Sequence, residues 1–252
     1  MDKFALLCYT VLGGVEGYGS AAKLLKFIFS VFLLVRAKSF LGCYMLSFKK
    51  FCYGNRFSNT YLVWDNDSRE ASVIDCGNRA AAVSAFVLEN GLTVNYVILT
   101  HVHYDHVLYI DEFRNEFSEA AVAIGEKDAE LLSDTEANVS YLFGDTRAFG
   151  GVDTKLFEGD KIYLGSSVLS VLNTPGHTPG GICIYAETEK LMFTGDTLFA
   201  GGGIGRTDFK YGDFEVLRKS LFRILSMDGN ITIFPGHGDS SKIKDEQASL
   251  FY

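Results

Sequence analysis

The chain has 252 residues, a length typical of one large domain or two small ones. Hydrophobic residues make up 48% and charged residues 21% of it, a composition that excludes a disordered or fibrous protein. The formal net charge is −8, and because an acidic chain without a basic cluster is poorly suited to bind a phosphate backbone, we expect no nucleic-acid partner. The five cysteines are widely spaced and form no CxxC pair, which favours a reducing compartment and a cytoplasmic protein.

Residues 1–44 differ from the rest, because they are apolar and aromatic and carry five basic but only two acidic residues. Their longest uncharged stretch is 12 residues, at 4–15, whereas a membrane span needs about 20. Lys23, Lys26 and Ser30 would share one face of a helix. Three interpretations stay open: an interfacial helix, a helix packed on the domain and an over-extended translation start, and membrane contact is not the favoured one. The functional domain is drawn at residues 45–252.

From residue 45 onward, short apolar strands alternate with helices, and residues 135–152 indicate an irregular excursion. Because strands come in runs with helices between them, neither a βαβ series nor an all-β fold fits. We predict an α+β fold with two mixed β-sheets packed face to face and helices outside. The expected strands are 48–53, 59–64, 71–75, 94–100, 120–123, 154–157, 161–163, 168–172, 181–185, 190–193 and 231–234; the expected helices are 79–90, 108–117, 126–132, 214–225 and 243–250.

The chain has only five histidines, and three of them lie in the heptapeptide THVHYDH directly after the expected strand 94–100. His101 and His103 are two residues apart, so in extended backbone both imidazoles point to one side and can reach one metal ion. Asp105 and His106 follow where the chain turns into a helix, in place for a second ion. Nitrogen and oxygen donors of this kind suit zinc in an open catalytic site.

Three further metal-type side chains lie in loops at other strand ends. His177 stands in TPGHTPG, Asp196 in FTGDT and His237 in FPGHG. Each alone is more typical of a surface residue, a cap or a turn. Together with the heptapeptide they account for every histidine of the chain and predict one metal centre.

These motifs, in this order, resemble the metallo-β-lactamase superfamily of hydrolases over residues 45–252. The segments GDTLFAGGGIGRTDF (195–209), SNTYLVWD (58–65) and ASVIDCG (71–77) are similar to its glyoxalase II branch, in short form. The resemblance implies a four-layer αβ/βα sandwich with a dinuclear metal site at the edge of the sheets. It implies these ligands: His101, His103 and His177 for the first ion, Asp105, His106 and His237 for the second, and Asp196 between them.

The resemblance also implies an activity, which is hydrolysis of a small-molecule thioester of the hydroxyacylglutathione type. The attacking group would be a hydroxide shared by two divalent ions, zinc first, with iron or manganese as alternatives. Asp105 is also placed to orient that hydroxide. Asp75 would support the site by contacting a metal ligand rather than the metal itself. The alternative is that Asp75 only stabilises a turn after the strand.

Three residues are expected near the substrate. Arg206 corresponds to a basic contact with glutathione, with a pair to Asp208 as the alternative. Tyr141 and Phe143 are candidates for the pocket wall, with core packing as the alternative.

Two other activities of the same fold stay open, a mononuclear iron persulfide dioxygenase, which shares GRTDF, and a lactonase. Antibiotic hydrolysis is disfavoured, because β-lactamases of the best-known type carry cysteine where this chain has Asp196. Only 15 residues follow His237, so the added C-terminal helical region of full-length glyoxalase II is not in this sequence.

Overall fold

The computed structural model describes residues 45–52 and 57–251. The expectations for residues 1–44 fall outside this part of the chain. Within it, no helix is long and apolar enough to cross a membrane.

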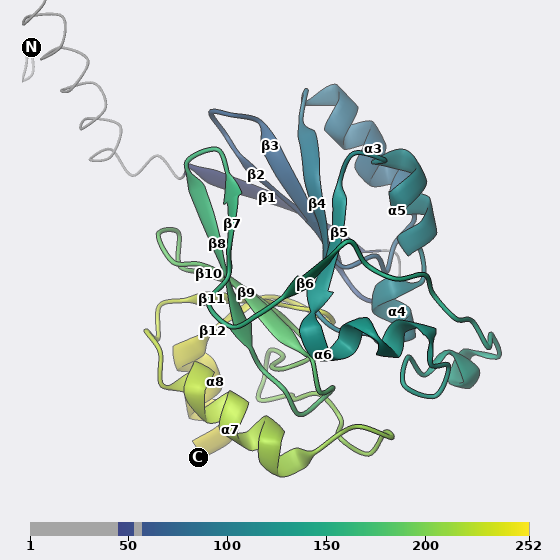
Figure 1. Cartoon of the computed structure of the whole chain (residues 1–252). Helices are drawn as coiled ribbons and strands as arrows, with labels where there is room; N and C mark the ends of the chain where they lie inside the picture. Colours follow the sequence, from purple (N-terminus) through teal and green to yellow (C-terminus); the bar gives the residue numbers. More distant parts are fainter. Residues whose placement is uncertain (1–44, 53–56, 252) are drawn as a thin grey trace, which may run out of the picture. The chain divides into compact units, whose positions relative to one another are not determined.

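The first of two sheets has six strands in the order β1-β2-β3-β4-β5-β6 (Figure 1). Its first three strands pair antiparallel and the others pair parallel. Along β2, Tyr61 and Val63 face the other sheet while Leu62 faces the helices, as the two-residue repeat of a strand requires. The strands are β1 (Leu46–Phe51), β2 (Thr60–Asp65), β3 (Glu70–Ile74), β4 (Thr93–Leu99), β5 (Ala121–Gly125) and β6 (Thr154–Leu156).

The second sheet also has six strands, in the order β12-β11-β10-β9-β8-β7. All of its pairs are antiparallel except β10 with β11. The strands are β7 (Lys161–Leu164), β8 (Ser167–Asn173), β9 (Ile182–Ala186), β10 (Leu191–Gly195), β11 (Thr232–Pro235) and β12 (Ser241–Lys242).

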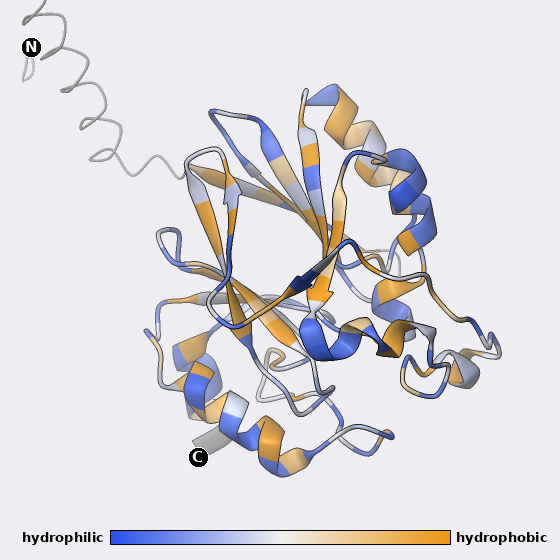
Figure 2. Ribbon diagram, viewed as in Figure 1, coloured by the Kyte–Doolittle hydropathy of each residue, from blue (hydrophilic) through white to orange (hydrophobic). Residues whose placement is uncertain are grey.

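Helices cover the outer faces of both sheets (Figure 1). One apolar core joins the first sheet to α3 and α5, a second lies between the sheets, and a third joins the second sheet to α7 and α8. Hydrophobic and hydrophilic residues alternate along the ribbon of α7 (Figure 2), and its buried face includes Leu217, Leu221 and Ile224. The helices are α3 (Ala80–Glu89), α4 (Tyr104–Val107), α5 (Ile110–Glu116), α6 (Glu126–Ala129), α7 (Phe214–Leu225) and α8 (Ile243–Phe251), with 3₁₀ turns at Leu131–Ser133 and Ser140–Phe143.

Two mixed sheets between helical layers confirm the predicted α+β sandwich. The predicted helix 108–117 is confirmed as α5, and the separate short helix α4 precedes it, where the chain was expected to turn into a helix. Because α4 begins at Tyr104, its first turn carries Asp105 and His106 toward the other metal-type side chains. The predicted excursion contains the short 3₁₀ turn at Ser140–Phe143, and β12 has no counterpart among the predicted strands.

Candidate active site

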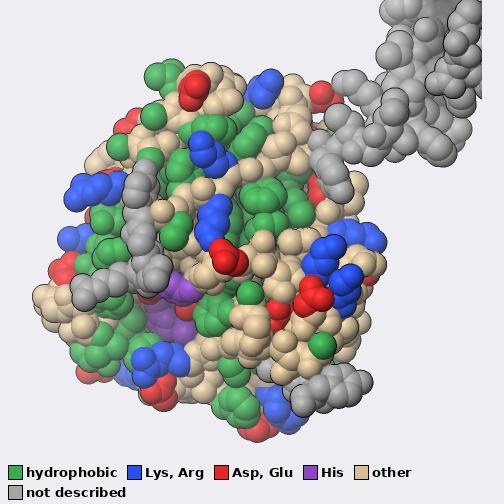
Figure 3. Space-filling model, turned by 180° about the vertical axis from the view of Figure 1, so that it is seen from behind, with side chains coloured by type: hydrophobic (Ala, Val, Ile, Leu, Met, Phe, Trp, Pro, Cys, Tyr) green, Lys and Arg blue, Asp and Glu red, His purple; other side chains and the backbone are tan. Residues whose placement is uncertain are grey.

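The seven predicted ligand residues meet at one edge of the two sheets. They come from the end of β4 and the short helix α4, the loop between β8 and β9, and the ends of β10 and β11. Histidine side chains reach the surface there in a hollow, with hydrophobic side chains beside them (Figure 3). Within each of three groups, the donor atoms lie within 4.8 Å of one another: His101, His103 and His177; His101, His106 and Asp196; and Asp105, His106 and His237.

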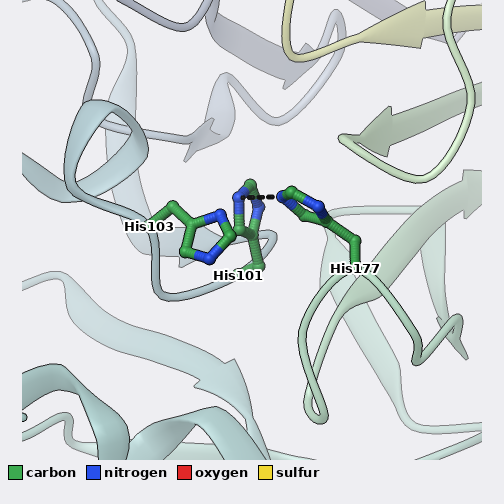
Figure 4. Close-up of side chains that lie close together, drawn as sticks. All are labelled: His101, His103 and His177. Carbon is green, nitrogen blue, oxygen red and sulfur yellow. Dashed lines mark hydrogen bonds between the residues drawn. The ribbon is translucent and has the colours of Figure 1, made fainter. Parts of the chain in front are cut away.

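The first group brings together histidines from both sheets (Figure 4). The Nε2 atoms of His101 and His177 lie 3.2 Å apart. Two nitrogens that bind one tetrahedral zinc ion at about 2.0–2.1 Å are about 3.3 Å from each other. The three rings are therefore close to the arrangement that a shared ion requires.

Asp196 lies between the first group and the third. Its Oδ1 is 3.1 Å from His106 Nε2, and its Oδ2 is 3.6 Å from His177 Nε2 and 3.7 Å from His237 Nε2. On the far side, Asp105 Oδ2 lies 2.9 Å from His237 Nε2. One carboxylate is thus within reach of both ion positions.

Two buried atoms of this cluster lack a hydrogen-bond partner in the described structure, His106 Nε2 and Asp196 Oδ1. Unsatisfied buried polar atoms are costly, and an ion that both atoms bind would remove the cost. Nitrogen and carboxylate donors suit zinc or iron. The residues present therefore fit the divalent metal that the fold binds.

Hydrogen bonds behind the histidines fix which ring nitrogen faces the centre. His106 Nδ1 donates to Asp75 Oδ2 at 2.8 Å, and His177 Nδ1 donates to the carbonyl oxygen of Arg206 at 2.7 Å. The Thr100 hydroxyl donates to Asp75 and lies 3.2 Å from His101 Nδ1. This network assigns the proton to Nδ1 in each ring and leaves the Nε2 lone pairs for a metal.

The charge state of the cluster follows from burial and from the neighbouring carboxylates. Burial, together with the other histidines, lowers the pKa of His101 and His103 well below the usual range. These rings are neutral at pH 7, as metal ligation requires. Burial opposes a charge on His106 too, but Asp196, Asp75 and Asp105 raise its pKa well above the usual range. The carboxylates around His106 therefore favour a positive charge at the third group. A proton on the His106 ring can supply that charge, and so can a metal ion.

Replacing Asp75 with asparagine should weaken binding of the second ion about 10- to 100-fold, the usual cost of losing a partner behind a ligand. The amide oxygen would stay on the Thr100 backbone N–H, which donates to Asp75 Oδ1 at 2.7 Å. The NH₂ group would then face His106 Nδ1 and force its proton onto Nε2, where it blocks the metal. Asparagine tolerates the positive φ of 61° at this position, so the fold should persist. Titration with Co²⁺, followed by absorbance, measures the change, and unaltered second-ion affinity would contradict it.

Asp128 in α6 braces the loops that carry the first group, a role that no sequence motif indicated. Its Oδ2 accepts hydrogen bonds from the Val102 N–H at 3.0 Å and the Thr178 hydroxyl at 2.7 Å, and its Oδ1 accepts from the Gly180 N–H at 2.6 Å. Val102 lies between His101 and His103, and Thr178 follows His177. Burial raises the pKa of Asp128 to about 6, against the effect of these hydrogen bonds, so the carboxylate is ionised at pH 7.

Glycine is required where backbone approaches the cluster. A Cβ at Gly236 would lie 2.4 Å from both Asp196 Oδ1 and His106 Cε1, and one at Gly205 would lie 2.0 Å from the Asp196 carbonyl oxygen. A side chain at either position would displace the ligands. This explains the glycine before His237 in FPGHG.

A cavity of about 440 Å³ opens above the cluster. Phe143 lines it, whereas Tyr141 is exposed beside it and is absent from its lining. Arg206 lines the cavity too, but its guanidinium forms two hydrogen bonds of 2.6 Å with Asp208. The other wall residues are mostly apolar and were not singled out from the sequence: Val139, Leu142, Phe199, Ile204 and Phe209.

Helix α8 fixes the loop between Phe199 and Ile204, which forms one wall of the cavity. The buried Glu246 of α8 accepts hydrogen bonds from the backbone N–H groups of Gly201 and Gly202, at 3.1 and 2.6 Å. Both glycines have positive φ angles, 77° and 76°, which other residues rarely adopt. The carboxylate thus fixes a loop that side-chain packing alone would leave loose.

Comparison with known proteins agrees with this geometry. The sequence model of the Metallo-beta-lactamase superfamily matches residues 53–237, and the chain belongs to that superfamily of metal-dependent enzymes. Hydroxyacylglutathione hydrolase GloC of Haemophilus influenzae is 34% identical over 194 residues, which are 76% of this chain and 90% of that protein. The resemblance to the glyoxalase II branch is thereby confirmed.

Two further proteins of the superfamily carry different names. The mitochondrial persulfide dioxygenase ETHE1 of Mus musculus is 33% identical over 180 residues, 71% of this chain but only 63% of that protein. The crystal structure of the BLEG-1 B3 metallo-beta-lactamase has a TM-score of 0.75 and 32% identity, covering 81% of this chain and 99% of that one. Proteins named for different activities are thus similar to this chain, and the fold does not fix the reaction.

Proposed function

We propose that this protein is a metal-dependent thioester hydrolase of the hydroxyacylglutathione hydrolase type. The observation that carries the proposal is the set of seven donor residues, in which Asp196 lies between the first group and the third. Such a set suits two divalent ions, with zinc as the first candidate. The similarity to GloC supports the choice of thioester as the bond that is cleaved.

In the proposed reaction, water adds to the thioester carbonyl, the carbon–sulfur bond breaks, and a carboxylic acid and a thiol leave. Bound divalent ions supply Lewis acidity and lower the pKa of water to about 7. His101, His103 and His177 would hold one ion, Asp105, His106 and His237 the other, and Asp196 both. The Asp105 carboxylate faces the cavity and can orient the attacking water. A thiol with a pKa near 8.5 leaves with little acid assistance.

The second candidate is persulfide oxidation, which the similarity to ETHE1 supports. A dioxygenase of this kind would need one iron ion, and the three histidines of the first group could hold it. The third group, with Asp105 and His237 only 2.9 Å apart, would then have no role. The complete third group favours the hydrolase.

Hydrolysis of S-lactoylglutathione by the full chain, loaded separately with Zn²⁺ and Fe²⁺, tests the proposal. We expect thiol release with the zinc form and no oxygen consumption when glutathione persulfide is offered to the iron form. Oxygen uptake without thiol release would replace the hydrolase with the dioxygenase. If the protein hydrolyses only a chromogenic cephalosporin or only a lactone, the bond that it cleaves is an amide or an ester and not a thioester.

We further propose a cytoplasmic, small-molecule enzyme without a nucleic-acid partner. Cys76 and Cys183 are buried free thiols, which suits a reducing compartment. For residues 1–44, membrane contact stays the interpretation that is not favoured.

A further inference from the structure

The 3₁₀ turn at Ser140–Phe143 presents three consecutive large apolar side chains to solvent beside the cavity. Tyr141 is 47% exposed, Leu142 52% and Phe143 44%, and we call these three residues the apolar rim. Leu142 and Phe143 also line the cavity. A run of exposed apolar residues is unfavourable in water unless it serves binding.

Hydrogen bonds and a ring contact fix the conformation of the turn that carries the apolar rim. Val139, a β-branched residue, holds a positive φ of 55°, which is strained. The Asn138 amide donates to the carbonyl oxygens of Leu132 and Arg147 at 2.9 and 2.8 Å, and its oxygen accepts from the Ser140 N–H at 2.9 Å. The Phe143 ring stacks on Tyr104, with centroids 4.8 Å apart. These contacts hold the rim in its exposed position.

Cations around the cavity are already paired. Arg206 is the only lysine or arginine among the described lining residues; it forms its pair with Asp208 and stacks on Phe209, 4.1 Å from the ring centroid. Arg147 and Lys210 are not among the lining residues, and both are paired: Arg147 lies 3.3 Å from Asp145, and Lys210 lies 2.7 Å from Glu136. A substrate with several carboxylates would have to compete with these pairs.

We propose that the cavity binds an apolar acyl group, whose chain lies along the rim, so that acyl thioesters of an uncharged thiol are better substrates than the anionic glutathione conjugate. This proposal rests on the proposed hydrolase function. The acyl carbonyl is placed at the metal-type cluster, and the hydrocarbon chain contacts Leu142, Phe143 and, across the cavity, Phe199. Each methylene that leaves water on these side chains favours binding.

The test compares kcat/KM of the zinc-loaded full chain for acetyl, butanoyl, hexanoyl and octanoyl thioesters of N-acetylcysteamine with that for S-lactoylglutathione. We expect kcat/KM to rise by up to about fourfold for each methylene that is buried. Leu142→Ser should lower kcat/KM for the octanoyl thioester by about tenfold and for the acetyl thioester by much less, because the short chain buries fewer methylenes. Leu88→Ser is the matched control, because Leu88 is 84% exposed on α3 and lines none of the described cavity.

The possible results distinguish failure of the acyl-binding inference from failure of the proposed hydrolase function. If S-lactoylglutathione is hydrolysed but kcat/KM does not rise with chain length, the acyl inference is overturned and the hydrolase stands. If nothing is hydrolysed, the hydrolase fails, and calorimetry with butyl and octyl thioethers of N-acetylcysteamine decides the binding question. Tighter binding of the octyl compound, lost in Leu142→Ser, would support the acyl site; equal or absent binding would overturn it.

Discussion

Replacing Asp196 with asparagine is expected to reduce the metal content from two ions per chain toward one and to lower kcat/KM for thioester hydrolysis by at least about 100-fold. The carboxylate faces His106 with one oxygen and His177 and His237 with the other. Asparagine keeps the shape, but its NH₂ group cannot bind an ion, and the negative charge is lost. Metal analysis by mass spectrometry and steady-state kinetics measure the two effects.

Asp65→Asn provides the matched control, because Asp65 is also a buried, hydrogen-bonded aspartate of this sandwich. Its Oδ1 accepts from the Ser68 N–H at 2.8 Å and its Oδ2 from the Ser167 hydroxyl at 2.8 Å, at the end of β2. This control should keep both ions, because Asp65 contacts none of the seven ligand residues in the hydrogen bonds above. Two bound ions and normal kinetics in Asp196→Asn would refute the assignment of Asp196 as the shared ligand.

Replacing Asp128 with alanine should weaken binding of the first ion about 10- to 100-fold, although Asp128 is not a ligand. The substitution leaves three buried donors without an acceptor, the Val102 and Gly180 N–H groups and the Thr178 hydroxyl. Each unsatisfied group costs about 1–3 kcal/mol, which the two loops can recover only by moving apart. His101, His103 and His177 would then no longer point their nitrogens at one ion. Competition with a chromogenic chelator measures the affinity for each ion.

Asp128→Asn should show a smaller loss, because the amide oxygen can still accept from Val102 and Thr178 while its NH₂ group opposes the Gly180 N–H. Asp65→Ala separates the positioning effect from general destabilisation. It should lower the free energy of unfolding without changing the affinity for either ion. If Asp65→Ala and Asp128→Ala lose metal affinity equally, Asp128 only stabilises the fold and does not position the histidines.

The sequence predicted the sandwich because strand and helix periodicities are local. It predicted the seven metal-type residues because they stand in short motifs, each directly after a strand or between two strands. Thr100–His106 is the clearest case, since a two-residue spacing at a strand end already fixes a shared direction for His101 and His103. That these residues meet at one edge follows from the topology of the two sheets.

Residues that support the site were harder to predict, because their roles depend on contacts between distant segments. Asp128 lies 26 residues from Val102 and 52 from Gly180 and has no motif around it. The short α4 was not predicted as an element of its own because four residues are too few to show a helical repeat. Leu142 was passed over because exposure, not residue type, is what marks it, and exposure requires the structure.

The first group of histidines joins the two halves of the sandwich. His101 and His103 extend from the first sheet, while His177 comes from the second. An ion bound by all three would act as a non-covalent cross-link between the sheets, in addition to the apolar core between them. Resistance to heat and occupancy by metal would then be a single linked property, because any ligand that binds only the folded chain stabilises it by mass action. Cells short of the metal would hold a less durable protein as well as an inactive one.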